Sequence, residues 1–226
     1  MSVLPPVRTF PVVLAAPSGT GKTTLARALV ERFESLVFSI SATTRDPREG
    51  EVDGVDYHFV PQPDFRAMVE RGELAEWAEV HGRLYGTLRR TLEQASQDGL
   101  HVVLDIDVQG ARQIQESVPE AVLVFVLPPS VEALLDRLTG RGTEPGPEVA
   151  RRLRSALDEL RAVPEFDYVV VNETVDECLT RLEGIIRAER HKVRRYPDLP
   201  GRVNGMLERI DTLLREKFSH AKYPDG

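Results

Sequence analysis

Residues 16–23 read Ala-Pro-Ser-Gly-Thr-Gly-Lys-Thr, and they separate an apolar run from a segment of helical periodicity. The apolar run is Phe10–Ala15, and the periodic segment carries Leu25, Ala28 and Leu29. A glycine-rich loop that ends in Gly-Lys-Thr between a strand and a helix is typical of a phosphate-binding loop. The alternative is an ordinary strand-to-helix turn with a surface lysine, and the flanking strand and helix favour the first interpretation.

The residue types of this loop suit the binding of phosphate groups. Gly19 and Gly21 allow the backbone amides to curve around phosphate oxygens. Lys22 can reach the terminal phosphates, and the Thr23 hydroxyl can bind Mg²⁺. The helix that follows would direct the positive end of its dipole at the same anion. Ala16 replaces the first glycine of the usual G-x-x-x-x-G-K-[ST] pattern, which we interpret as the mark of a subfamily rather than of an inactive site.

Length and composition predict an ordinary globular protein. The chain has 226 residues, a net charge of −7 and 41% hydrophobic residues, which suffices for one large domain with a buried core. No apolar stretch reaches the ~18 to 20 residues of a membrane span, and the first ten residues lack the pattern of a signal peptide. We therefore expect a cytoplasmic protein without a membrane partner. The acidic balance argues against general nucleic-acid binding and leaves small anionic substrates open.

Cysteine and histidine usage gives no sign of a metal site or a disulfide framework. The single cysteine, Cys178, lies in the periodic segment 175–186, so we expect it to pack in the core. The five histidines lack ligand-like spacing on one helix, and we interpret them as structural or surface residues.

Five apolar runs alternate with segments of helical periodicity, and this pattern predicts an α/β core with a parallel sheet flanked by helices. The expected strands lie within Phe10–Ala15, Leu36–Ile40, His101–Ile106, Ala121–Leu127 and Tyr168–Val171, and the first expected helix covers 22–33. Two segments interrupt the alternation. One is interpreted as a substrate-binding insertion with short strands around 57–60 and 84–86, and the other as a helical lid of two helices joined by a hinge around 140–147. The expected division is a domain over 1–193, with core segments 10–40, 98–130 and 165–193, an insertion over 41–97, a lid over about 131–164, and a C-terminal extension over 194–226.

A second charged motif lies at the start of the insertion. In the segment Ser41–Glu51, Arg45 and Arg48 flank Pro47 and can point into one pocket. Planar guanidinium groups bind phosphate by paired hydrogen bonds, so this turn predicts a second phosphate site. A solvated charged turn is the alternative for this segment taken alone.

Five motifs then follow one another in a single order over about residues 10–190. They are the loop at 16–23, S-x-T-T-R-x-P-R-x-G-E at 41–51, Glu76 within ELAEWAEVHG, Tyr85-Gly86-Thr87, and Leu104-Asp105-Ile106-Asp107-Val108-Gln109-Gly110. In this combination the chain resembles the guanylate kinase family. The resemblance implies a P-loop nucleoside-monophosphate kinase that transfers the γ-phosphoryl group of ATP to GMP, and also to dGMP, with Mg²⁺ as cofactor.

The resemblance also implies roles for particular residues. The GMP site would consist of Ser41, Arg45, Arg48, Tyr57, Glu76, Tyr85, Gly86, Thr87 and Asp105, with the arginines and tyrosines on the phosphate and Ser41, Glu76 and Thr87 on guanine. The ATP site would consist of Ala16, Pro17, Ser18, Gly19, Thr20, Gly21, Lys22, Thr23, Thr24 and Asn172, with Asn172 near adenine. The groups that stabilise the transferred phosphoryl would be Lys22, Arg137, Arg141 and Arg152. Thr23 and Asp107 are expected to support the metal, although the residues themselves leave open whether Asp105 or Asp107 does so.

Several alternatives remain open at this point. The chain could be a binding module of the kind that some guanylate-kinase-like domains form, or a P-loop kinase with a sugar phosphate as acceptor. For Glu76 alone, the alternative is a surface carboxylate on a helix beside Trp77. Arg83-Leu84 departs from the residues that many relatives carry before Tyr85, a difference that bears on the shape of the phosphate pocket. The apolar positions between Val203 and Leu214 suggest that the extension docks on the core or on a second subunit, so a homodimer is possible.

Overall fold

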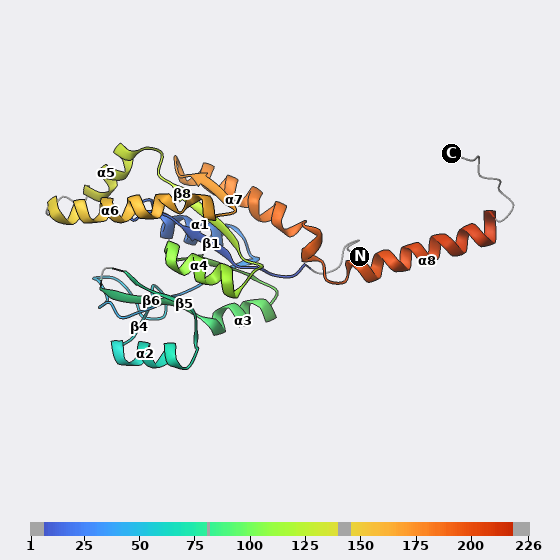
Figure 1. Ribbon diagram of the computed structural model, residues 1–226, viewed down its shortest axis with the longest axis horizontal. Helices are drawn as coiled ribbons and strands as arrows, with labels where there is room; N and C mark the ends of the chain where they lie inside the picture. The colour runs from blue at the N-terminus through green and yellow to red at the C-terminus, as the bar shows by residue number, and fades with distance from the viewer. Residues whose placement is uncertain (1–6, 81, 140–145, 219–226) are drawn as a thin grey trace. The chain divides into compact units, whose positions relative to one another are not determined.

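The computed structural model describes residues 7–80, 82–139 and 146–218 (Figure 1). The chain divides into two compact units. One comprises Thr9–Arg187, and the other combines the N-terminal residues up to Arg8 with the chain from Ala188 onward. Each unit is described by itself below.

The larger unit is built on a five-stranded parallel sheet with the strand order β2-β7-β1-β8-β9. The strands are β1 (Val12–Ala15), β2 (Leu36–Phe38), β7 (His101–Asp105), β8 (Val122–Leu127) and β9 (Tyr168–Val171). Each lies within one of the five apolar runs of the sequence. The runs are nearly continuous because both faces of a parallel sheet are covered by helices. The predicted fold class is confirmed.

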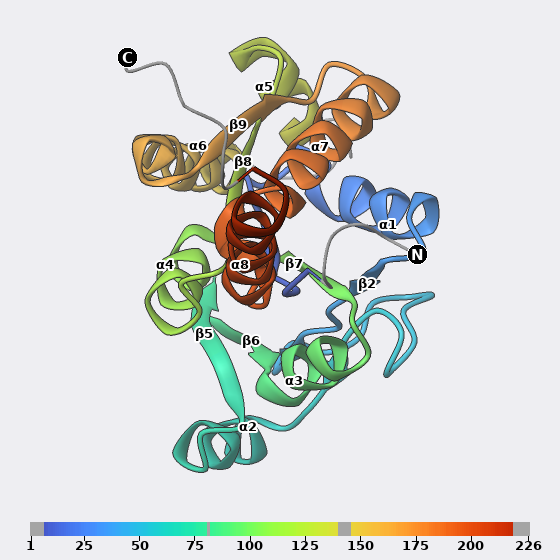
Figure 2. The ribbon, with the colours of Figure 1, turned by 90° about the vertical axis from the view of Figure 1, so that its right-hand side faces the viewer.

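The two faces of this sheet carry separate hydrophobic clusters. Val12 and Leu14 point to the face covered by α1 (Lys22–Arg32) and α7 (Val175–Arg190), whereas Val13 and Ala15 point to the opposite face, because successive side chains of a strand alternate. The opposite face is covered by α3 (Arg89–Gln97) and α4 (Val108–Ser117), and Figure 2 shows α1 and α4 on different sides of the sheet. The buried thiol of Cys178 belongs to the first cluster, as the sequence predicts.

The segment between β2 and α3 forms a second, four-stranded sheet with the order β4-β3-β6-β5. Its elements are β3 (Ala42–Thr43), β4 (His58–Phe59), α2 (Gln62–Glu70), β5 (Leu74–Val80) and β6 (Arg83–Leu88). The strands predicted near Tyr57 and Leu84 are present. The helical alternative for Glu76 is wrong, because this residue lies on β5 and pairs with Thr87 of β6.

Two helices occupy the segment predicted as a lid, namely α5 (Val131–Thr139) and α6 (Gly146–Arg161). They pack together through a small cluster that includes Leu138 and Ala156. Most of the predicted hinge, 140–145, lies outside the described residues. A 3₁₀ turn, η1 (Val163–Glu165), then leads into β9.

The smaller unit contains η2 (Val193–Arg195) and α8 (Leu199–Phe218). Its start at Ala188 differs from the boundary at 193/194 expected from the sequence. The physical reason is a buried carboxylate, Glu189, whose Oε2 lies 2.9 Å from the buried Arg195 guanidinium and ties the end of α7 to the extension. No helix in the described part of the chain is long and apolar enough to cross a membrane.

Candidate active site

A cavity of about 1170 Å³ opens at the carboxyl ends of β1 and β7 in the larger unit, between the phosphate loop, the insertion and the lid helices. Ligand sites in open α/β sheets lie at this edge. Among the predicted residues, those that line the cavity are residues 16–24, Ser41, Arg45, Arg48, Tyr57, Glu76, Tyr85, Asp105, Asp107, Arg137 and Arg152. Thr87 lies behind Glu76 and Asn172 lies behind the loop. Arg141 lies outside the described residues.

The phosphate loop depends on its two glycines. Gly19 and Gly21 have φ angles of +86° and +89°, in the left-handed region that disfavours other residues. A Cβ on Gly19 would lie 3.1 Å from Cδ2 of Leu138, and a Cβ on Gly21 would lie 3.1 Å from Nδ2 of Asn172. The glycines therefore permit both the turn and the close approach of α5 and Asn172.

Polar contacts hold the loop from behind and from the lid. Asn172 Nδ2 donates to the Thr20 carbonyl at 2.7 Å, and the Arg137 guanidinium donates to the same oxygen at 3.1 Å. Arg152 of α6 donates to the Ser18 hydroxyl at 2.9 Å. Two of the predicted catalytic arginines thus already lie against the loop, and Asn172, predicted near adenine, supports the loop backbone in this structure.

Asp105, at the end of β7, lies on the phosphate-loop side of the cavity. Its Oδ1 is 3.0 Å from Lys22 Nζ, and its Oδ2 accepts a hydrogen bond from the Thr23 hydroxyl. Lys22 also donates to the Ile106 carbonyl. A hydroxyl and a carboxylate in contact form an oxygen donor set that suits Mg²⁺.

Asp107 has a different position. It is the N-cap of α4, and its Oδ1 accepts from the Gly110 amide at 2.8 Å, as N-cap carboxylates commonly do. The Glu76 carboxylate lies over the same turn, because a Cβ on Gly110 would be only 2.5 Å from Glu76 Oε2. Asp107 therefore lies beside Glu76 at the start of α4, whereas Asp105 lies against Thr23. The geometry favours exchanging the roles that the sequence assigned to these two aspartates.

Glu76 is a buried carboxylate in the lining of the cavity. Its side chain accepts a hydrogen bond from Thr87 Oγ1 at 2.6 Å, and the residue is 4% exposed. Burial raises its pKa to about 7, with a smaller upward effect from Asp107, while the Thr87 hydrogen bond and Lys22 act in the opposite direction. The group can therefore change charge near neutral pH.

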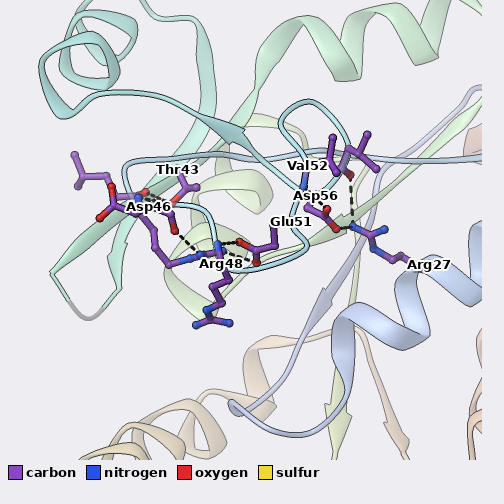
Figure 3. A network of polar contacts seen from close by, with 10 residues as sticks. Arg27, Thr43, Asp46, Arg48, Glu51, Val52 and Asp56 are labelled. Carbon is purple, nitrogen blue, oxygen red and sulfur yellow. Dashed lines mark hydrogen bonds and ion pairs between the residues drawn. The ribbon is translucent and has the colours of Figure 1, made fainter.

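The predicted arginines and tyrosines of the insertion line the same cavity as Glu76 and the phosphate loop. The Arg45 guanidinium lies 5.3 Å from the centre of the Tyr57 ring, and the Tyr57 and Tyr85 rings meet edge to face at 6.0 Å. Glu51 connects the two arginines, since it pairs with the Arg45 guanidinium at 2.8 Å and accepts from the Arg48 backbone amide at 2.7 Å. Figure 3 shows Glu51 beside Arg48. Burial raises the pKa of the Tyr57 phenol, which keeps it a hydrogen-bond donor.

The sequence analysis gave no role to two acidic residues near the cavity, Glu51 and Glu159. Glu51 stands in the quoted motif but received no role, although an acidic residue near two arginines is itself a signal. Glu159 of α6 also lines the cavity. Burial raises its pKa to about 7, and its Oε2 finds no hydrogen-bond partner among the described residues. Its spacing of seven from Arg152 places both on one helix face, which could have indicated it.

The comparisons with known proteins agree with this geometry. The family model of guanylate kinases matches residues 8–189. A guanylate kinase of Dechloromonas aromatica is 51% identical over 176 residues, covering 78% of this chain and 87% of the relative. One of Clostridioides difficile is 42% identical over 188 residues, covering 83% and 92%. The crystal structure of guanylate kinase from Anaplasma phagocytophilum matches with a TM-score of 0.73 at 34% identity, covering 96% of this chain and 98% of that one.

The structural match has the same α/β architecture, and the family model spans the phosphate loop, the insertion, the lid helices and β9. Taken with the cavity that these elements enclose, the matches show that this chain belongs to the guanylate kinase family, the nucleoside-monophosphate kinases that phosphorylate GMP to GDP with ATP.

Proposed function

We propose that the cavity binds GMP and ATP at opposite ends, with guanine against Glu76 and the triphosphate against the loop at 16–23. The observation that carries this proposal is the Glu76 carboxylate, which is buried, accepts from Thr87 and lines the cavity. Guanine offers N1–H and an exocyclic amine side by side, and an ionised carboxylate accepts from both. Adenine lacks that pair of donors.

Asp107 is proposed to join Glu76 on the guanine side. Its contact with the start of α4 and its electrostatic effect on Glu76 support this role. Asp105 is proposed to act on the metal side instead, because it contacts Thr23 and Lys22. Guanylate kinases are generally Mg²⁺-dependent, and Thr23 and Asp105 are the oxygen donors that would hold the ion. When bound, Mg²⁺ would neutralise charge on the ATP phosphates.

The GMP phosphate is proposed to lie among Arg45, Arg48, Tyr57 and Tyr85. Glu51 holds the Arg45 guanidinium and the Arg48 backbone amide, so the Arg45 donors and the turn that carries Arg48 are arranged before the substrate arrives. Ser41, which also lines the cavity, is proposed to contact guanine. None of these contacts involves the ribose 2′-hydroxyl, so the same proposal includes dGMP as a substrate.

In the proposed reaction, an oxygen of the GMP phosphate attacks the γ-phosphorus of ATP, the bond from that phosphorus to the β,γ-bridging oxygen breaks, and ADP leaves. The attacking oxygen is already an anion, so alignment and charge stabilisation replace a general base. Lys22 and the lid arginines Arg137 and Arg152 supply positive charge at the loop. Arg141 keeps this role as a prediction from the resemblance. Closure of the lid helices would exclude water from the transferred group.

The division into core, GMP-binding insertion and lid is part of this proposal, and the position of the cavity between these three parts supports it. The cytoplasmic location, the homodimer and the absence of nucleic-acid binding remain predictions from the sequence.

An ADP-release assay with Mg-ATP and a panel of acceptors tests the proposed pocket. We expect turnover with GMP and dGMP, weaker turnover with IMP, which lacks the exocyclic amine, and AMP slower by at least roughly 1000-fold, since a site built to pair with polar groups strongly rejects their absence. Equal use of GMP and AMP would contradict the guanine-reading role of Glu76. Turnover with a sugar phosphate alone would favour the alternative acceptor, and no turnover would favour the binding module.

A further inference from the structure

An ion pair links the helix that follows the phosphate loop to the loop that carries the GMP-site arginines. Arg27 lies on α1, four residues after Thr23, and its NH2 is 2.6 Å from Asp56 Oδ1. The same nitrogen donates to the Val55 carbonyl at 3.4 Å. Figure 3 shows Arg27 reaching from α1 to the turn that contains Val52 and Asp56.

Asp56 also stabilises the turn in which it lies. Its Oδ2 accepts from the Val52 amide at 2.9 Å, so each carboxylate oxygen has its own partner. Gly50 and Gly54 have φ angles of +85° and +75°, and these permit the tight path of the segment. Backbone hydrogen bonds within the segment also hold the turn, such as the one from the Val55 amide to the Val52 carbonyl at 3.2 Å. The Asp56 carboxylate adds to them and also attaches the turn to α1.

The turn is continuous with the proposed GMP-phosphate site. Glu51, which pairs with Arg45 and accepts from the Arg48 amide, directly precedes Val52. Asp56 holds the backbone of Val52, and the position of Val52 in turn affects its neighbour Glu51, which contacts both arginines. Tyr57, whose ring lies beside Arg45, directly follows Asp56.

A smaller cavity of about 220 Å³ lies at this junction, and its lining includes Thr23, Arg27, Arg48, Asp56 and Asp105. The ion pair thus borders the space between the proposed metal ligands and a proposed GMP-phosphate ligand. The pair is partly exposed, with side-chain exposures of 40% for Arg27 and 26% for Asp56. A pair of this kind can form and break in solution, and salt weakens it.

The insertion has a second polar attachment at a different place. Gln113 of α4 donates to the Trp77 carbonyl at 2.7 Å and accepts from its amide at 3.1 Å. That contact holds β5, the strand that carries Glu76, through main-chain atoms. The Arg27–Asp56 pair instead holds the arginine-bearing turn, and it does so through two ionised side chains.

We propose that the Arg27–Asp56 pair is a positioning device that sets the GMP-phosphate turn against α1, so that the acceptor phosphate faces the phosphate loop. The inference rests on the proposed function, because it assumes that Arg45 and Arg48 hold the GMP phosphate. Neither Arg27 nor Asp56 is assigned a contact with substrate. Without the pair the turn is no longer attached to α1 through these side chains, so its position must be fixed by GMP itself. GMP binding therefore weakens, while ATP binding at the phosphate loop is unchanged.

The experiment compares steady-state constants for Asp56→Asn, Arg27→Met and the double variant. We expect each single variant to raise KM for GMP about 3- to 10-fold, as for loss of one partly exposed charge pair, with KM for ATP within about twofold of wild type. The double variant should resemble the single ones, because both remove the same interaction. Glu73→Gln is the matched control, since the Arg71–Glu73 pair is also 2.6 Å long but lies within the insertion and has no contact with α1.

Arg48→Ala separates failure of this inference from failure of the proposed function. If Arg48→Ala raises KM for GMP while both partners of the pair can be changed without effect, the positioning role is overturned and the GMP site stands. Equal increases in KM for both substrates, or fully additive effects in the double variant, would also overturn it. If Arg48→Ala leaves KM for GMP unchanged, the proposed phosphate site itself is wrong. Arg27→Met provides the test from the α1 side if Asp56→Asn does not fold.

Discussion

Replacing Glu76 with glutamine should make the protein more stable at alkaline pH and a poorer GMP kinase. Glutamine has nearly the same shape, and its carbonyl oxygen can still accept from Thr87. What the change removes is a negative charge that must be buried without a cationic partner in contact. A site that binds substrate by such a charge carries a cost in stability.

The size of the stability effect follows from the pKa of Glu76, which burial raises from 4.5 to about 7. Each pKa unit corresponds to about 1.4 kcal/mol, so the ionised group destabilises the folded state by about 3 kcal/mol above pH 7. Between pH 4.5 and pH 7 the unfolded chain is ionised while the folded one is protonated. Stability due to this group is therefore fully present below pH 4.5 and is lost as the pH rises toward 7.

The assay is chemical denaturation of the wild type and Glu76→Gln at pH 8 and at pH 5. We expect the variant to have the larger free energy of unfolding at pH 8, by up to about 3 kcal/mol, and a difference under about 1 kcal/mol at pH 5. A stability difference that is the same at both pH values, or a less stable variant at pH 8, would refute the reasoning.

The same variant should bind GMP less well at pH 8. Loss of one charge-assisted hydrogen bond to guanine costs about 2 to 3 kcal/mol, which corresponds to a roughly 30- to 150-fold increase in the dissociation constant. The affinity of the wild type should fall below pH 7, because protonation of Glu76 removes the charge that accepts from guanine. ATP affinity serves as the internal control, and an equal loss for both nucleotides would reject the assigned role.

Two further predictions concern packing and the lid. Gly86→Ala should destabilise the protein by about 1 to 3 kcal/mol, because the new Cβ would lie 2.9 Å from Leu74 Cδ1 and 3.0 Å from the Glu76 carbonyl oxygen. An unchanged melting temperature in a thermal denaturation scan would contradict this prediction. Glu159→Gln should lower KM for ATP at pH 8 and have little effect at pH 6, because burial raises the pKa of this carboxyl to about 7 and only its ionised form repels the triphosphate. A steady-state titration of ATP at the two pH values checks it, and a pH-independent effect would show that charge is not the cause.

The strands of the main sheet could be predicted because their signal is local. Each strand is buried on both faces of the sheet, so nearly all of its residues are apolar and the run stands out in the sequence. Strand β5 was not predicted, since its buried row consists of Leu74, Glu76 and Ala78 while Trp77 is the more exposed residue. A functional carboxylate that faces inward inverts the pattern on which strand prediction depends.

The candidate site was predictable where the chemistry lies in consecutive residues, as in the phosphate loop. The two aspartates after β7 were harder to assign, because their separate positions depend on where the strand ends and α4 begins. An aspartate directly before a segment of helical periodicity is a capping signal, and it could have identified Asp107 as the N-cap of α4. The Arg27–Asp56 pair joins residues far apart in the sequence, and no local pattern indicates such a contact.

The most direct test of the account is a crystal structure of the protein with GMP and a non-hydrolysable ATP analogue. We predict guanine N1 within hydrogen-bond distance of the Glu76 carboxylate, with the GMP phosphate directed at the γ-phosphate beside Lys22. Guanine bound elsewhere in the cavity, with Glu76 in contact with neither nucleotide, would contradict the account.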